Sequence, residues 1–196
     1  STPGMIIVKR TDTTGNWKTY HSGLTSAAYY VHLNATTAQT SDSTVWNSTA
    51  PTSSVFSVGT HADVNASGGT YVAYVFAGSS AGGFGAAGTD SIVACGSYTG
   101  NGSASGPSVS LGWEPQFVIV KMSSSTGDWN IFDNMRGIPT GSADPYLFAN
   151  TSAAEATTNG DLIDVTATGF VIKSTNAEVN TSSGTYIYLA IRRGPM

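Results

Sequence analysis

The sequence contains the same pattern twice, and this repetition constrains the fold more than any other feature. Residues 3–9 (PGMIIVK) match residues 115–121 (PQFVIVK), which lie 112 residues further along. A second block at residues 65–74 matches residues 180–189 at an offset of 115 residues. Self-similarity over such a long period fixes the architecture of a chain before any single residue is interpreted. The sequence therefore predicts two tandem copies of one structural unit.

Each copy has the pattern of an all-β fold. Apolar runs of strand length are separated by Gly, Pro, Asn and Ser residues that favour turns. In the second copy these runs lie at 117–121, 129–133, 146–149, 162–165, 170–173 and 186–192. The spacing predicts an antiparallel β-sandwich, jelly-roll-like, in each copy. Residues 36–39 and 152–155 both fit a capping-box pattern, which predicts one helical turn at each place.

The matching blocks also predict the domain boundaries. We expect a first β-sandwich repeat at residues 1–77, a glycine-rich linker at 78–91, and a second repeat at 92–196 that begins with a hairpin. Because Ser1 aligns with Trp113, the first copy has no counterpart to the hairpin at 92–112. A sandwich without two of its strands exposes unpaired strand edges. We expect another copy or a neighbouring chain to complete that edge.

Composition excludes several classes of function. Charged residues make up 10% of the chain, against about 25% in ordinary soluble domains. The net charge is −4 and the 8 Lys and Arg residues are scattered, so the sequence does not indicate nucleic-acid binding. Its apolar runs are too short to cross a bilayer, so no membrane insertion is expected. The single cysteine, Cys95, has apolar neighbours, which predict a buried structural thiol.

The sequence shows no convincing catalytic set. The histidines His21, His32 and His61 have no matching histidines in the second copy, and the serines do not form a G-x-S-x-G motif. Asp161 and Asp164 are three residues apart, which in an extended strand places them on opposite faces. We therefore assign no catalytic, cofactor-binding or metal-binding residue.

One alternative for metal binding stays open at this point. Asp128 and Asp133, with the nearby Asn130 and Asn134, carry the oxygen ligands that Ca²⁺ prefers. The spacing matches no standard calcium-binding loop, so the sequence does not decide whether a calcium ion is bound.

The tryptophans fall into two groups. Trp17 and Trp129 occupy the same position in the two copies, which favours packing in the core. Trp46 and Trp113 lie outside the matching blocks, in segments rich in turn residues. We therefore expect Trp46 and Trp113 to be exposed and to serve as binding or interface residues.

Several strings resemble a repeat domain of structural proteins from tailed bacteriophages, notably viruses of marine bacteria and cyanobacteria. These strings lie at residues 7–17 (IVKRTDTTGNW), 46–52 (WNSTAPT), 65–71 (NASGGTY), 96–102 (GSYTGNG) and 129–134 (WNIFDN). The resemblance implies a virion component, either a tail or fibre appendage or a capsid decoration protein on the virion exterior. It carries over no catalytic residue. Proteins of that kind are often longer and contain further copies.

These observations lead to two expectations of function. The first is a non-enzymatic virion surface protein without a cofactor, which assembles with itself and with other virion proteins and contacts a host-surface glycan or protein. The second is a secreted carbohydrate-binding module or carbohydrate-active enzyme, in which Trp46 or Trp113 stacks on a sugar and acids such as Asp133 do chemistry. A cleft with two carboxylates beside an exposed tryptophan would favour the second, and buried tryptophans would count against it.

Overall fold

The computed structural model describes residues 1–78 and 91–194. The fold is mostly β, with 37% of the residues in strands and 7% in helices. All-β architecture built from antiparallel sheets was predicted and is confirmed. The chain divides into two compact units, Ser1–Gly96 and Ser97–Met196.

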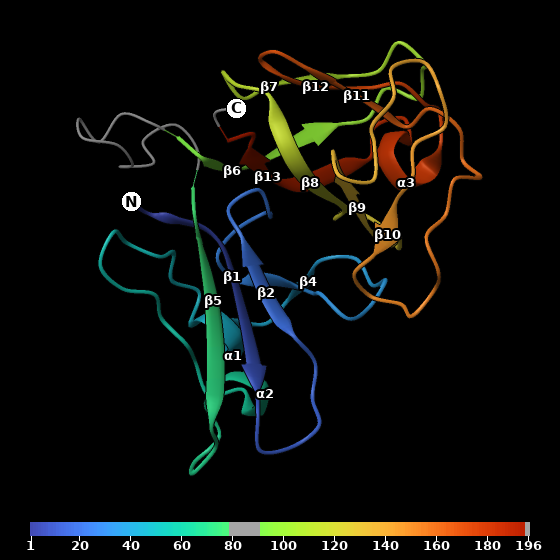
Figure 1. The fold of residues 1–196 in the computed structure, drawn as a ribbon. Coiled ribbons are helices and arrows are strands. Elements are labelled where there is room, and N and C mark those ends of the chain that lie inside the picture. Colours follow the sequence, from blue (N-terminus) through green and yellow to red (C-terminus); the bar gives the residue numbers. More distant parts are fainter. Residues whose placement is uncertain (79–90, 195–196) are drawn as a thin grey trace. The chain divides into compact units, whose positions relative to one another are not determined.

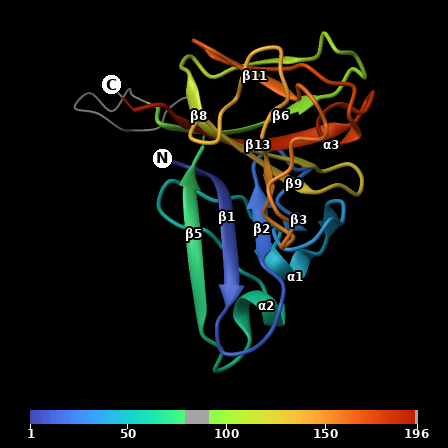
Figure 2. The same cartoon turned by 45° about the vertical axis from the view of Figure 1, so that its right-hand side comes forward.

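Unit 1 is built on a single five-stranded antiparallel sheet (Figures 1 and 2). The strand order is β4-β3-β2-β1-β5, so β5 forms one edge of the sheet. The bounds are β1 Pro3–Arg10, β2 Lys18–His21, β3 Tyr29–His32, β4 Thr40–Ser41 and β5 Tyr71–Ala77. Each neighbouring pair is antiparallel, with Ile6 opposite both Tyr20 on β2 and Val75 on β5.

Two short helices cover one face of this sheet. They are α1, Ser43–Trp46, and α2, Ala62–Asn65. Asp42 caps α1, because its carboxylate accepts a hydrogen bond from the Thr44 N–H. The core between helices and sheet contains Ile6, Val8, Tyr20, Tyr30, Val45, Trp46 and Val64, with Phe56 and Val58 packed against it. Among the described residues of unit 1, helices and loop residues take the place of a second sheet.

Unit 2 contains two sheets. A five-stranded sheet has the order β10-β9-β8-β13-β6, and a three-stranded sheet has the order β11-β12-β7. Phe170 on β12 packs edge-on against Tyr98 on β6 and Tyr188 on β13, with ring centroids 6.5 and 5.4 Å apart, so the sheets face each other as in a sandwich. The bounds are β6 Val93–Thr99, β7 Ser108–Ser110, β8 Pro115–Met122, β9 Trp129–Asp133, β10 Leu147–Phe148, β11 Ile163–Thr166, β12 Gly169–Ile172, α3 Ala177–Asn180 and β13 Thr185–Arg192.

The two units share one strand arrangement. The order β3-β2-β1-β5 in unit 1 corresponds to β10-β9-β8-β13 in unit 2, and a one-turn helix precedes the last strand of each. Their registers also agree, because Tyr71 pairs with Arg10 and Tyr186 pairs with Met122, 112 residues after Arg10. The duplication itself stays a prediction from the sequence.

Some local predictions were wrong. Residues 36–39 and 152–155 are not helical, and the helices lie at α1, α2 and α3 instead. The capping pattern failed there because no apolar helical face follows it that could pack on the sheet. The two compact units divide between Gly96 and Ser97, inside β6, while the domain bounds 1–77 and 92–196 stay a prediction. The predicted linker at 78–91 falls almost entirely outside the described residues.

Candidate strand-docking site

The two tryptophans predicted to be exposed are both buried. Trp46 is 1% exposed and Trp113 is 7% exposed. Trp46 is the last residue of α1 and packs edge-on against Tyr20, with ring centroids 6.1 Å apart. The turn residues that follow, Asn47 and Ser48, adopt left-handed backbone conformations that end the helix while the indole faces the core. The expectation of an exposed binding role for Trp46 and Trp113 was therefore wrong.

The carboxylates considered for calcium are engaged by protein donors. Asp128 accepts a hydrogen bond of 2.6 Å from the Asn150 side chain, and Asp133 forms an ion pair with Arg136. Asn130 is buried and its amide lies 3.3 Å from Glu178. Within residues 1–78 and 91–194, no group of three or more His, Cys, Asp or Glu side chains is arranged to hold a metal ion.

The polar side chains of a cluster in unit 1 form hydrogen bonds and ion pairs with one another. The Lys18 ammonium lies 3.1 Å from His32 Nε2 and 3.7 Å from the Asp63 carboxylate. Burial and the Lys18 charge lower the pKa of His32 to about 4, so its ring is neutral at pH 7 and its Nε2 accepts a hydrogen bond from the Lys18 ammonium. His61 caps α2 by accepting a hydrogen bond from the Asp63 N–H. These contacts give the cluster a structural role.

A set of hydrogen bonds and stacked tyrosine rings lies where β6 joins the edge of the sheet in unit 2. The Tyr186 hydroxyl donates to the Ala177 carbonyl and accepts from the Thr181 N–H, both at 2.7 Å, which fixes its ring at the start of β13. Tyr98 of β6 stacks on that ring, with centroids 5.0 Å apart and planes 9° from parallel. The Tyr98 hydroxyl donates to the Val179 carbonyl at 2.8 Å. Burial raises the pKa of Tyr98 well above its usual range, so it remains a donor.

Asn180 holds the turn that follows β6. Its side-chain oxygen accepts a hydrogen bond of 2.8 Å from the Asn101 N–H, and its amide donates to the carbonyls of Ser103 and Ser174 at 2.7 and 2.8 Å. Asn180 is fully buried. Because all of its polar atoms are used, this residue fastens the β6–β7 hairpin (residues 93–110) to unit 2.

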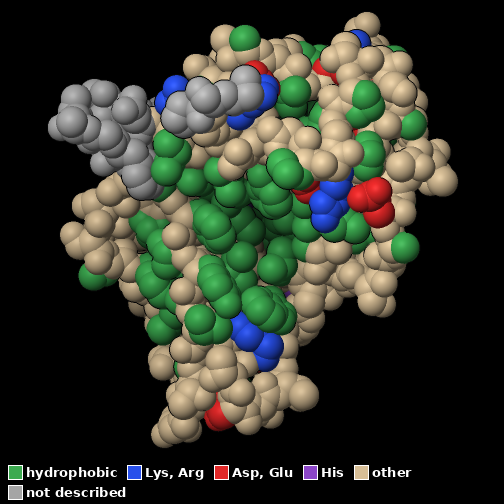
Figure 3. All heavy atoms as spheres, in the orientation of Figure 1, with side chains coloured by type: hydrophobic (Ala, Val, Ile, Leu, Met, Phe, Trp, Pro, Cys, Tyr) green, Lys and Arg blue, Asp and Glu red, His purple; other side chains and the backbone are tan. Residues whose placement is uncertain are grey.

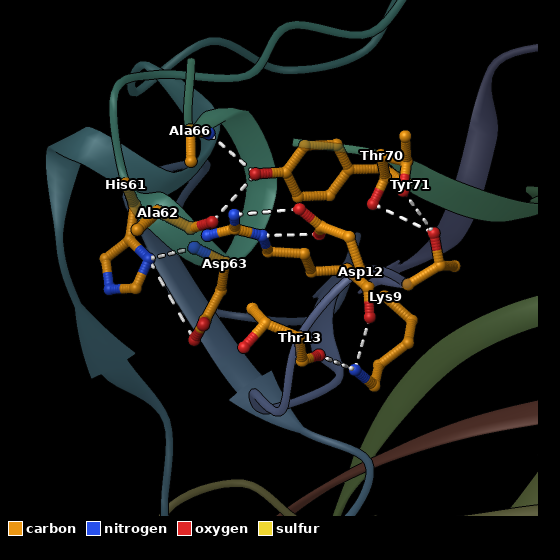
Figure 4. Close-up of polar contacts among 11 residues, drawn as sticks. Lys9, Asp12, Thr13, His61, Ala62, Asp63, Ala66, Thr70 and Tyr71 are labelled. Carbon is orange, nitrogen blue, oxygen red and sulfur yellow. Dashed lines mark hydrogen bonds and ion pairs between the residues drawn. The ribbon is translucent and has the colours of Figure 1, made fainter. Parts of the chain in front are cut away.

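Unit 1 has the same corner at Tyr71, the first residue of β5 (Figure 4). The Tyr71 hydroxyl donates to the Ala62 carbonyl at 2.8 Å and accepts from the Ala66 N–H at 2.6 Å. The Asn65 amide donates to the Gly59 carbonyl at 2.8 Å, as Asn180 does to Ser174. Within residues 1–78 and 91–194, no strand pairs with the outer edge of β5.

The last strands of the two units differ in burial. Residues Tyr186 to Ala190 of β13 are all buried. On β5 the corresponding stretch is open, with Tyr74 47% and Val75 51% exposed. Figure 3 shows hydrophobic side chains gathered over β5 and β1. Together with Asn65 and the turn at Gly68 and Gly69, the outer edge of β5 forms the candidate docking site.

The charges of unit 1 lie away from the middle of this edge. Arg10 and Asp12 form an ion pair near the end of β5, and Arg10 lowers the pKa of Asp12 to about 2. Strand β5 itself has the sequence YVAYVFA, without a charged residue. The edge is therefore suited to main-chain hydrogen bonds and apolar contacts.

The sequence pointed to this site only in part. The missing counterpart of residues 92–112 indicated an open edge in unit 1. No role was assigned to Asn65 and Asn180 from the sequence. Their shared place in the two matching blocks was the available signal.

Comparison with known proteins gives a family for the chain. No helix within the described residues is long and apolar enough to span a membrane. No curated protein and no solved structure matches the chain. A family model, described as "Domain of unknown function (DUF7483)", matches residues 1–195, and the chain belongs to that family.

Proposed function

We propose that this chain is a non-enzymatic structural protein of a bacteriophage virion, positioned on the exterior as a tail or fibre appendage or as a capsid decoration. Its β-units assemble with one another and with neighbouring virion proteins through strand edges, and its loops contact the host surface. We further propose that the two units arose by duplication.

One observation carries this proposal. The same four-strand arrangement is completed by β6 in unit 2, and the described residues contain no such strand beside β5 in unit 1. An open, uncharged strand edge is a template for pairing with another polypeptide, and isolated soluble domains normally protect such edges. The resemblance of residues 7–17 and 96–102 to phage structural repeats supports the virion context.

The carbohydrate-binding alternative has lost its main support. Trp46 and Trp113, the residues expected to stack on a sugar, are buried. A surface pocket of about 440 Å³ lies at the start of β1. Its described lining contains no carboxylate side chain and consists of Ser1, Thr2, Pro3, Gly4, Ser22, Ser53 and Gly78. Neither feature favours glycoside chemistry, which uses a pair of carboxylates.

The test of the proposal is the location of the protein. Antibodies against the purified chain should label intact particles of the phage that encodes it, as seen by immunogold electron microscopy. Mass spectrometry of gradient-purified particles should detect the chain at a fixed ratio to the major capsid protein. Its absence from purified particles would overturn the proposal.

A further inference from the structure

We propose that the outer edge of β5 binds an added β-hairpin of the same kind as β6–β7, supplied from outside unit 1, with the sequence Tyr-x-Gly-Asn-Gly at the end of its first strand. The inference deepens the proposed function by naming the partner segment. Unit 2 serves as the template, because it contains both the receiving corner and the hairpin that occupies it.

The main chain supplies the first part of the argument. In unit 2, the Gly100 N–H donates to the Gly184 carbonyl and the Ser183 N–H donates to the Gly100 carbonyl, at 2.8 and 2.9 Å. The end of β6 therefore lies beside the start of β13, which is an antiparallel arrangement. The equivalent groups in unit 1 are the Gly69 carbonyl and the Gly68 N–H, and neither has a hydrogen-bond partner within the described residues. An added strand would pair with both.

The glycine in the motif is a steric requirement. A Cβ atom on Gly100 would lie 2.3 Å from the Thr181 carbonyl oxygen, which is closer than any side chain tolerates. Only glycine allows the hairpin to approach the corner this closely. This position therefore selects against other strand sequences.

Side chains supply the second part. Tyr71 of unit 1 is held like Tyr186 of unit 2, by a helix carbonyl and a turn N–H, and its ring is half-buried while that of Tyr186 is fully buried. An incoming tyrosine would cover the Tyr71 ring, as Tyr98 covers Tyr186. Asn65 is exposed in unit 1, whereas Asn180 is buried by the hairpin.

The apolar surface and the charge pattern agree with this partner. Ala73, Tyr74 and Val75 in the middle of β5 are exposed, and an added strand would cover them. At the far end of β5, Cys95 Sγ already approaches the Ala77 carbonyl at 3.5 Å, so the open part of the edge is the part nearer Tyr71. Neither β5 nor residues 93–110 contain a charged residue, so the two segments themselves would meet through main-chain and apolar contacts.

The experiment uses the whole chain and a synthetic peptide of residues 91–112 that carries Cys95→Ala to prevent oxidation. Calorimetry should show saturable binding of one peptide per chain. Two-dimensional amide NMR should place the shift changes at Asn65–Val75 and not at β13. Two peptides test the motif: Gly100→Ala should bind at least about tenfold more weakly, while Ser97→Ala, at an exposed position, should bind like the parent peptide.

Two chain variants test the receiving side. Asn65→Ala should weaken peptide binding by about tenfold, whereas the exposed neighbour Ser67→Ala should leave it unchanged. Circular dichroism checks that both variants remain folded. The proposal is overturned if the parent peptide does not bind, if Gly100→Ala binds equally well, or if the shifts lie only at β13. Pairing of two chains through β5 that the peptide does not displace would also overturn it.

This outcome is independent of where the protein resides. If the peptide binds but purified virions lack the chain, the proposed function is refuted and the docking site stands. If virions contain the chain but the peptide does not bind, the docking site is refuted and the proposed function stands.

Discussion

At the scale of single residues, the sequence predicted burial best where the neighbours are uniformly apolar. Cys95 follows Ile92, Val93 and Ala94, and it is buried as expected. Trp46 was misplaced because polar turn residues follow it, and a helix that ends at the tryptophan can point the ring inward while those residues face solvent. The direction in which the Trp46 ring points depends on where the helix ends, and local composition does not reveal that position.

Cys95 gives a prediction of chemical reactivity. Burial raises the pKa of its thiol to about 12, so the thiolate that reacts with alkylating agents is scarce at pH 8. We expect iodoacetamide to leave the folded chain unmodified at pH 8 and to label Cys95 fully in denaturant, as measured by mass spectrometry. Rapid labelling of the native chain would show that β6 opens easily or that the thiol is accessible.

Asp144 gives a prediction of pH dependence. Its carboxylate is fully buried and accepts hydrogen bonds from the N–H groups of Leu162 and Ile163. Burial raises the pKa of Asp144 to about 6, and the charges of Asp161 and Asp164 act in the same direction. The two N–H donors lower the pKa, but by less than burial raises it. The folded chain thus holds this proton more tightly than the unfolded chain. The free energy of unfolding should therefore decrease as the pH rises from about 4 to about 6, by up to about 3 kcal/mol.

The variant Asp144→Asn isolates this contribution, because an amide oxygen can accept the same two hydrogen bonds and does not titrate. His32, whose pKa is lowered to about 4, acts in the opposite direction between about pH 4 and pH 6.5. The difference in unfolding free energy between wild type and variant, measured in urea at several pH values, removes the histidine term. An identical pH dependence in the two proteins would refute the prediction.

At the scale of elements, the repeated blocks located the strands well and the helices poorly. Strands β8 and β13 lie at the predicted runs 117–121 and 186–192, and β1 and β5 lie at the matching blocks of the first copy. The one-turn helices α2 and α3 were not predicted, because their four residues carry too short a pattern to reveal a periodicity. Helix α3 contacts residues that are far away in the sequence, because its Val179 carbonyl accepts a hydrogen bond from the Tyr98 hydroxyl.

The hydrogen bonds of Asn180 and Asn65 give a matched pair of stability predictions. Asn180→Ala should destabilise unit 2 by about 2–4 kcal/mol, because it leaves buried main-chain groups of the hairpin without partners. Asn65→Ala should cost less than about 1 kcal/mol, since Asn65 is exposed and makes one such bond. Urea denaturation of both variants measures the difference. Equal losses would mean that the two corners do not differ as the structure indicates.

At the scale of the whole molecule, the sequence predicted two units, and the chain divides into two compact units. Strand β6 follows the first unit in sequence and yet belongs to the main sheet of the second. Such long-range strand pairing leaves no local signature. The candidate site could be anticipated as an open edge, but its residues emerged only from comparing the corners in three dimensions.

Two compact units predict two unfolding transitions. We expect differential scanning calorimetry of the intact chain to resolve them, since compact units of one chain commonly unfold as separate cooperative units. Asn180→Ala should lower one midpoint and leave the other in place, and the peptide of residues 91–112 should raise the remaining midpoint. A single transition that shifts as a whole would show that the units unfold together.

The place of the β6–β7 hairpin in the chain also affects how the protein is made. The ribosome completes β5 and then the hairpin, but β13, the permanent partner of β6, begins only at Thr185. During that interval the hairpin is without its final neighbour, while the edge of β5 is already finished. On the docking proposed above, β5 would offer the hairpin an edge to pair with before β13 is synthesised, and the two edges would then compete for it.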